Sequence, residues 1–119
     1  MGIGPRDGKC FVETHVENAF IFQPCDGSPV TYFWDNTENH NKTMVKLTNF
    51  SPACEMELTI VGPNNNVIYK GGPFGATERI FQAEDVRRIR VTCTGENPDV
   101  FCQGFLVIQK TFCICCNDF

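Results

Sequence analysis

The chain has 119 residues, of which 42% are hydrophobic and 20% charged, so it fits one domain with enough apolar material for one packed core. Its 14 acidic and ten basic residues give a net charge of −4, which argues against nucleic-acid binding, because that depends on neutralising phosphates with Lys and Arg. No apolar run approaches the roughly 20 residues that a membrane-spanning helix needs. The chain has 11 Phe and only one Trp, and so many phenylalanines suit a dry sandwich core or an interface.

The predicted elements begin after a short arm. Residues 1–9 are rich in Gly, Pro and charge, which is typical of a flexible terminus. Alternation of apolar and polar residues then predicts strands at residues 11–14, 16–23, 30–34, 43–48, 55–60, 67–70, 77–81, 88–93 and 101–110. The clearest is 55–60, in which Met56, Leu58 and Ile60 face one side. Residues 105–108, Phe-Leu-Val-Ile, are apolar on both faces and predict a strand buried on both sides, inside the subunit or against a neighbour.

Turn chemistry separates these strands. Clusters of Gly, Pro, Asn and Asp occur at residues 25–29, 62–66, 71–73 and 95–99. The one candidate for a helical turn is residues 82–86. Frequent turns without a helical period predict an all-β sandwich or barrel spanning residues 10–112, followed by a cysteine-rich tail at residues 113–119.

Eight cysteines are the most informative feature of the composition, because dense cysteine indicates an oxidising destination, metal binding or redox chemistry. They are Cys10, Cys25, Cys54, Cys93, Cys102, Cys113, Cys115 and Cys116. Adjacent cysteines rarely bond to each other, so Cys115 and Cys116 need two different partners, and a tail of this kind could reach two neighbours. Four bridges within the chain, bridges between subunits, and metal-bound or free thiols all remain open, and eight cysteines allow 105 pairings.

The signals for metal binding and catalysis are weak. The tail spacing Cys113-x-Cys115-Cys116 is tighter than a zinc knuckle, and His15 and His40 are far from any cysteine pair in sequence. No nucleophile elbow occurs, so we expect no enzyme, no metal and no cofactor. His15 is interpreted as a strand residue and His40 as part of a polar loop.

Other candidate sites have a structural interpretation beside the functional one. The polar residues 35–42 could bind calcium or a sugar, but they lack the ligand order of an EF-hand and are interpreted as a solvated loop. Glycosylation triplets at Asn41 and Asn49 arise easily by chance. An exposed aromatic platform around Phe33 and Trp34 would favour a binding module.

The C-terminal half resembles a known family. The segments VIYKGGPFGATERIF (residues 67–81), VRRIRVTCTG (86–95) and FCQGFLVIQKTF (101–112) resemble the endospore appendage (Ena) subunits of Bacillus-type spore formers, or a related spore-surface protein. That resemblance implies a jelly-roll subunit that stacks into pilus-like fibres, with a flexible connector whose cysteines bond to strands of a neighbour. Cys102 matches the cysteine of the last strand, Cys25 matches one in an early strand, and Cys10 takes the connector role. The family's connector carries a Cys-Cys pair, whereas here the pair is at the C-terminus.

Pattern and resemblance together predict a single jelly-roll-like β-sandwich of about eight antiparallel strands with flexible, cysteine-bearing termini. The expected function is structural: self-assembly with copies of itself, and with other spore-surface subunits, by edge-strand addition and intersubunit disulfides. The alternatives are a monomeric disulfide-rich binding module and a viral capsid or decoration protein. The N-terminus lacks the apolar stretch of a signal peptide, so either a signal was removed before this numbering or the protein reaches an oxidising place without the usual export route. The family resemblance implies an extracellular, spore-surface location reached by mother-cell lysis.

Overall fold

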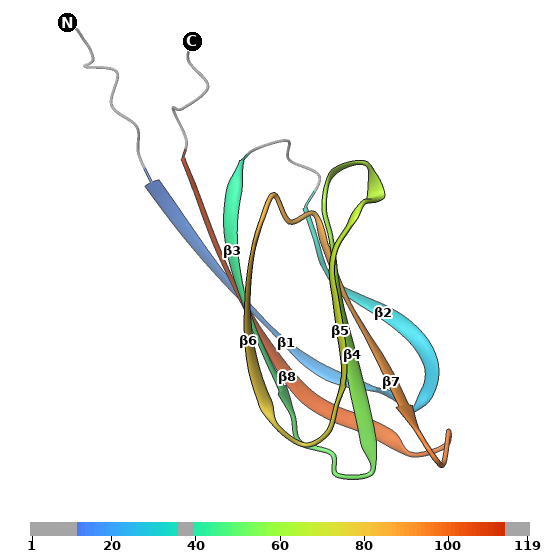
Figure 1. Ribbon diagram of the computed structural model, residues 1–119. Helices are drawn as coiled ribbons and strands as arrows, with labels where there is room; N and C mark the ends of the chain where they lie inside the picture. Colours follow the sequence, from blue (N-terminus) through green and yellow to red (C-terminus); the bar gives the residue numbers. More distant parts are fainter. Residues whose placement is uncertain (1–11, 36–39, 114–119) are drawn as a thin grey trace, which may run out of the picture.

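The computed structural model describes residues 12–35 and 40–113. Within them the chain is all-β, and Figure 1 shows two layers of strands facing each other. The elements are β1 (Val12–Pro24), β2 (Asp26–Trp34), β3 (Asn41–Asn49), β4 (Cys54–Val61), a single 3-10 turn η1 (Pro63–Asn65), β5 (Val67–Phe74), β6 (Glu78–Glu84), β7 (Arg88–Gly95) and β8 (Phe101–Cys113). No helix in this part of the chain has the length and apolar character needed to span a membrane.

The strands form two antiparallel four-stranded sheets. Sheet A has the order β1-β8-β3-β6 and sheet B the order β2-β7-β4-β5. Only β4 and β5 are consecutive neighbours in one sheet, and every other connection crosses from one sheet to the other. This interleaved order is that of an eight-stranded jelly roll, which confirms the predicted fold class.

The first and last strands pair along their whole length. Each has 13 residues, and the register runs from Val12 opposite Cys113 to Pro24 opposite Phe101. The two ends of the described chain therefore lie side by side at one end of the sandwich (Figure 1). The predicted arm at residues 1–9 and nearly all of the tail at residues 113–119 lie outside the described residues.

The core is formed by the alternating residues that the sequence predicts. On β4, β7 and β3 the inward side chains are at most 1% exposed, as expected for half-buried strands. They are Met56, Leu58, Ile60, Ile89, Val91, Cys93, Val45 and Leu47. The predictions for these three strands are confirmed.

Two local predictions are wrong. Residues 82–86 form no helical turn: β6 continues to Glu84, and Asp85 turns the chain with a φ of 57° so that β7 can enter the opposite sheet. In addition, the two strands predicted at residues 11–14 and 16–23 are one continuous strand, β1. In the run at residues 105–108, Leu106 and Ile108 are in the core, whereas Phe105 and Val107 are half-buried on the outer face, so burial of that face against a neighbour stays a prediction.

Gly104 in β8 allows the two sheets to approach closely. A Cβ at this position would be 2.7 Å from the Met56 methyl group and would also collide with the Thr48 carbonyl oxygen. Met56 therefore fills the space that a side chain at residue 104 would need, and it packs across from one sheet to the other.

We expect Gly104→Ala to lower the free energy of unfolding by about 1–3 kcal/mol, because the added methyl group overpacks the core. The measurement is denaturant titration, made in a protein whose terminal cysteines are all replaced by Ser. Gly75→Ala is the matched control, because a Cβ at Gly75 meets nothing within 4 Å and should change stability by no more than about 0.5 kcal/mol. Equal stability of the two variants would contradict this account of the core.

Candidate functional site: a cysteine cluster and an apolar outer face

A disulfide joins Cys25 and Cys54 at one end of the sandwich. Cys25 is the single residue between β1 and β2, and Cys54 opens β4, with 6.1 Å between their Cα atoms. Gly95 makes room for this bond, because a Cβ there would be 2.8 Å from the Ala53 carbonyl oxygen and 3.3 Å from the Cys25 Cβ. Because the two cysteines are separated by 29 positions in the sequence, loop-closure entropy predicts a stabilisation of about 3–4 kcal/mol.

Two further cysteines lie next to that disulfide as free thiols. Cys93 on β7 and Cys102 on β8 are both fully buried, and their side chains form a hydrogen bond across the two sheets. Burial raises the pKa of both thiols. Cys93 also donates a hydrogen bond to the Cys102 sulfur, and this bond raises the pKa of Cys93 further. Both groups are therefore mainly protonated at neutral pH, which slows their reaction with reagents from solvent.

The sulfur atoms of Cys25, Cys54 and Cys102 lie within 4.8 Å of one another. Among the described residues this is the group whose geometry comes nearest to a metal site. Two of its three sulfurs are bonded to each other, so they are not thiolate ligands while the disulfide is closed. Cys102 therefore lies beside both sulfurs of the disulfide on one side and interacts with Cys93 on the other.

The remaining cysteines are at the chain termini. Cys10, Cys115 and Cys116 lie outside the described residues, and the Cys113 backbone forms the last residue of β8, opposite Val12. The resemblance implied that Cys25 and Cys102 bond to a neighbouring subunit. In this structure Cys25 is bonded to Cys54, and Cys102 is 0% exposed.

The outer face of sheet A carries phenylalanine side chains in solvent. Phe22 stacks on Phe101 with 4.7 Å between ring centroids, and Phe20 contacts Phe105 edge-on at 5.2 Å. Phe20, Phe22 and Phe101 are 76%, 61% and 45% exposed. We call the surface formed by Phe20, Phe22, Phe101 and Phe105 the Phe face. Sequence composition indicated an excess of Phe but could not say that part of it points outward.

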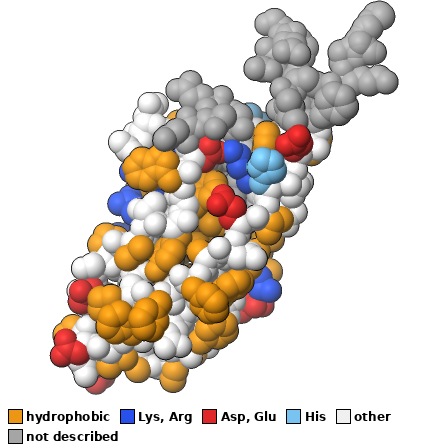
Figure 2. All heavy atoms as spheres, turned by 180° about the vertical axis from the view of Figure 1, so that it is seen from behind, with side chains coloured by type: hydrophobic (Ala, Val, Ile, Leu, Met, Phe, Trp, Pro, Cys, Tyr) orange, Lys and Arg blue, Asp and Glu red, His pale blue; other side chains and the backbone are white. Residues whose placement is uncertain are grey.

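Hydrophobic side chains also gather in patches on the side of the molecule seen in Figure 2. On the same outer face of sheet A as the Phe face, Val16 on β1 and Ile80 on β6 are 58% and 62% exposed. Contiguous exposed apolar groups of this kind are typical of interaction surfaces rather than of inert surface.

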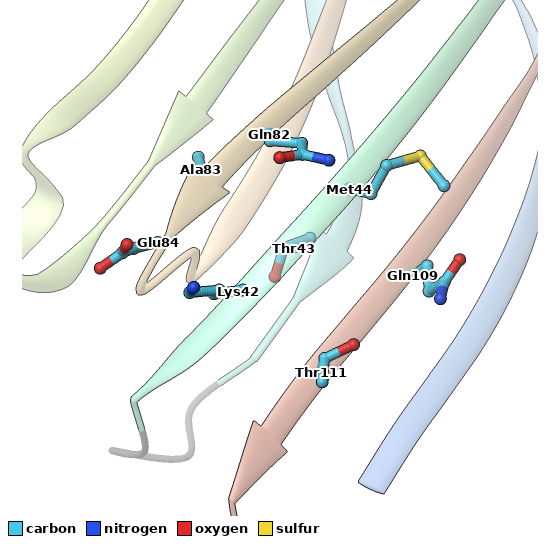
Figure 3. A pocket seen from close by; sticks show the side chains of 8 residues that line it. All are labelled: Lys42, Thr43, Met44, Gln82, Ala83, Glu84, Gln109 and Thr111. Carbon is cyan, nitrogen blue, oxygen red and sulfur yellow. The ribbon is translucent and has the colours of Figure 1, made fainter. Parts of the chain in front are cut away.

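One hollow on the outer face of sheet A shows no catalytic arrangement. It has a volume of about 630 Å³ and spans β3, β6 and β8, and its charged side chains are Lys42 and Glu84. Figure 3 shows its side chains spread along the strands rather than aimed at one point. Neither histidine nor cysteine lines it, so it offers none of the usual nucleophile and base pairs.

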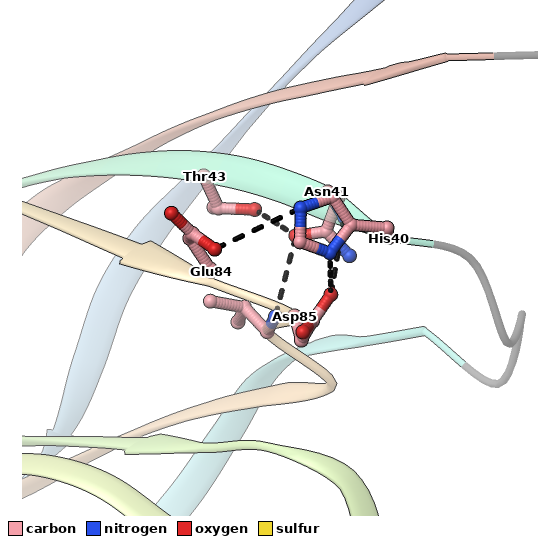
Figure 4. Close-up of polar contacts among 6 residues, drawn as sticks. His40, Asn41, Thr43, Glu84 and Asp85 are labelled. Atoms are coloured by element: carbon pink, nitrogen blue, oxygen red, sulfur yellow. Dashed lines mark hydrogen bonds and ion pairs between the residues drawn. The ribbon is translucent and has the colours of Figure 1, made fainter. Parts of the chain in front are cut away.

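The polar residues at the other end of the sandwich hold the structure together. Asn41 is 1% exposed, and its Oδ1 accepts hydrogen bonds from Thr43 and from the Val86 backbone N–H (Figure 4). His40 pairs with Asp85 at 2.9 Å and with Glu84 at 3.7 Å. Residues 36–39 of the predicted polar loop lie outside the described residues, whereas Asn41 is a buried structural group.

The two glycosylation triplets are explained by the same kind of role. The Asn49 side-chain amide is 3% exposed and donates to the carbonyl oxygens of Cys54 and Phe74 at 3.0 and 3.1 Å. Both its donor hydrogens are used, so in the folded protein this amide is not presented as an acceptor for a sugar.

The aromatic platform that would favour a binding module is incomplete. Phe33 is 6% exposed and belongs to the core. Trp34 is 59% exposed, but the Arg88 guanidinium lies 4.9 Å from its ring centroid and covers one face. His15, predicted as a strand residue, is confirmed in β1, where it contacts Glu13 at 3.2 Å.

Comparison with known proteins supports the fold. No protein-family model and no curated protein matches the sequence. Among solved structures, a subunit of the Bacillus endospore appendages, described as a family of disulfide-linked pili, superposes with a TM-score of 0.74 at 6% identity, covering 89% of this chain and 91% of that one. The resemblance to endospore appendage subunits is thereby confirmed at the level of the fold.

A second similarity is to a viral capsid protein. A structure of the VP2 subviral particle of infectious bursal disease virus superposes with a TM-score of 0.55 at 10% identity, covering 87% of this chain and 33% of that one. A structure of the Gt strain of the same virus gives 0.54 at 8% identity, covering 93% of this chain and 33% of that one. These similarities, too, concern the jelly-roll fold alone.

The buried thiols supply a direct test of this site. In the folded protein we expect Cys93 and Cys102 to resist a maleimide reagent for many minutes at pH 7–8, because both are protonated below their raised pKa values and out of contact with solvent. After denaturation both should react at once. The measurement is mass spectrometry of a variant whose terminal cysteines are Ser, and rapid labelling of the native protein would contradict the burial described here.

Proposed function

We propose that the chain is a structural subunit, not an enzyme, that assembles with copies of itself into a disulfide-crosslinked fibre or shell on a spore surface. The observation that carries the proposal is the Phe face on β1 and β8. Four aromatic rings in two contacting pairs on one exposed surface cost free energy in water that burial against another copy would recover.

The free sheet edges support assembly by strand addition. Among the described strands, β1 and β6 end sheet A, and β2 and β5 end sheet B. An edge strand presents unpaired backbone N–H and C=O groups that another strand can pair with. The edge strand β1 is 13 residues long and borders the Phe face, so pairing at this edge and burial of the rings could occur in one interface.

The distribution of cysteines supports crosslinking through the termini. The four cysteines of the sandwich are at most 2% exposed, so a bond from any of them to a neighbour would require local opening. We therefore assign intersubunit disulfides to Cys10, Cys113, Cys115 and Cys116. Because β1 and β8 end side by side, the arm and the tail leave the sandwich from the same end (Figure 1).

A fibre and a closed shell are both compatible with these surfaces. The similarity to an endospore appendage subunit favours a fibre, and the similarity to a viral capsid protein keeps a shell as the second candidate. A location on a spore, with release by mother-cell lysis, and the participation of other spore-surface subunits are part of the same proposal.

Denaturing gel electrophoresis without reductant tests covalent assembly. We expect a ladder or immobile high-mass material that collapses on reduction to a single band near 13.4 kDa. The control is a variant with Cys10, Cys113, Cys115 and Cys116 replaced by Ser, which should run as a monomer with or without reductant. Wild-type protein that runs as a clean monomer in both lanes would contradict crosslinking, and electron microscopy of the same sample distinguishes a fibre from a shell.

A charge on the Phe face tests the proposed interface. We expect Phe20→Lys to reduce the sedimentable fraction at least several-fold, because an unpaired cation would be buried in the contact. Thr94→Lys is the matched control, since it adds the same charge to an exposed residue of β7, an interior strand of sheet B, and should leave assembly unchanged. Thermal unfolding of both variants shows whether the fold is intact, and normal assembly of a folded Phe20→Lys protein would exclude the Phe face as the interface.

A further inference from the structure

The four core cysteines connect the two sheets through a continuous series of sulfur contacts. Cys25 and Cys54 are bonded at the corner of the sandwich, and the Cys102 sulfur lies within 4.8 Å of both of their sulfurs. Cys102 in turn accepts a hydrogen bond from Cys93. Because Cys93 belongs to sheet B and Cys102 to sheet A, the inner pair spans the interior between the sheets.

We propose that Cys93 and Cys102 are a latent second disulfide between the sheets, and that the Cys25–Cys54 bond transmits oxidation to them by internal thiol–disulfide exchange. This inference goes beyond the proposed assembly and does not depend on it.

The exchange needs no reagent from outside the protein. The Cys102 thiolate attacks one sulfur of the Cys25–Cys54 bond, forms a new disulfide with it, and releases the other sulfur as a thiolate, which takes up the proton that Cys102 lost. Cys93 then attacks the Cys102 sulfur, forms Cys93–Cys102, and the remaining corner sulfur leaves as a thiol. One disulfide has moved inward, and the numbers of thiols and disulfides are unchanged.

Net oxidation follows at the corner. The reduced Cys25 and Cys54 thiols lose two protons and two electrons to a small-molecule disulfide such as oxidised glutathione, which is reduced to two thiols. The Cys25–Cys54 bond is restored, and the sandwich now holds two disulfides in place of one.

Position sets the order of attack. The Cys102 sulfur lies within 4.8 Å of both sulfurs of the existing disulfide, and Cys93 does not belong to that group. Cys102 is therefore the nucleophile of the first step, and Cys93 resolves the intermediate in the second.

The inner bond would form between side chains that already interact with each other. All four cysteines are packed in one core cluster, and the bond needs the sulfurs of Cys93 and Cys102 to approach to about 2.05 Å. The product would tie β7 to β8 directly and leave no free thiol inside the subunit. The terminal four cysteines would then be the ones left to react with neighbours.

The test uses the variant in which Cys10, Cys113, Cys115 and Cys116 are Ser, so that only the core cysteines remain. Thiols are counted in denaturant before and after long incubation with oxidised glutathione. We expect two thiols per chain before incubation and none after it, with a mass loss of about 2 Da and a Cys93–Cys102 peptide after proteolysis. Two thiols per chain after incubation would overturn the proposal.

A trapping variant tests the exchange itself. In Cys93→Ser the resolving thiol is missing, so a fraction of the protein should carry Cys102 bonded to Cys25 or Cys54, detected by peptide mapping after acid quenching. Cys102→Ser is the matched control and should carry the Cys25–Cys54 bond alone. A Cys93→Ser protein that maps only to Cys25–Cys54 would exclude the internal route.

The readouts separate this inference from the proposed function. Assembly is measured on wild-type protein by the ladder on the gel, whereas exchange is measured on a variant that lacks the crosslinking cysteines. A wild-type protein that stays monomeric with a fully oxidised core would refute assembly alone, and an assembling protein whose core keeps two thiols would refute the second disulfide alone.

Discussion

The pairing of β1 with β8 is the interaction on which the rest of the structure depends. It joins residues from the two ends of the chain over 13 positions, and β8 in turn supports β3 on its other side. Without it, sheet A would lose its edge strand β1, and the inward side chain Ile21 would no longer lie beside Leu106 and Ile108. The same pairing brings the described termini together, places the Phe face on two adjacent strands, and holds Cys102 over the corner disulfide. Stability and the proposed interface therefore have one structural source.

The cysteines divide into two groups because of burial. Those inside the sandwich, Cys25, Cys54, Cys93 and Cys102, lie in a dry core where thiols are protonated and reagents have little access. A crosslink between subunits needs sulfur that a neighbour can reach, and for this reason we propose that Cys10, Cys113, Cys115 and Cys116 form it. A protein with both groups can keep the stability of its fold independent of the state of its intersubunit bonds. This separation suits a subunit whose fold must survive before, during and after assembly.

Alternation predicted the strands well where one face is buried and the other solvated. Residues 55–60 and 88–93 are of this kind, and their inward sets match the structure. Alternation failed where burial ends partway along a strand, as in β1, whose first residues are exposed on both faces. It also failed at Asp85, where a single left-handed residue turns the chain in a segment that reads as helical. The Cys25–Cys54 pair could not be predicted, because 105 pairings are consistent with eight cysteines and only the three-dimensional fold brings these two together.

The number of phenylalanines alone does not say which of them are buried, because that depends on the register in which β1 pairs with β8. Eleven phenylalanines suited either a core or an interface, and the structure uses them for both: Phe33 is in the core, whereas Phe20 and Phe22 point outward from β1. The inward side of the same stretch of β1 is occupied by Ile21 and Gln23. A slip of one residue in the β1–β8 register would exchange these two sets and place the phenylalanines in a core that Met56 and Leu106 already fill. The register that excludes the rings from the core is therefore the same constraint that exposes them on the outer face of sheet A, where we propose that another copy binds.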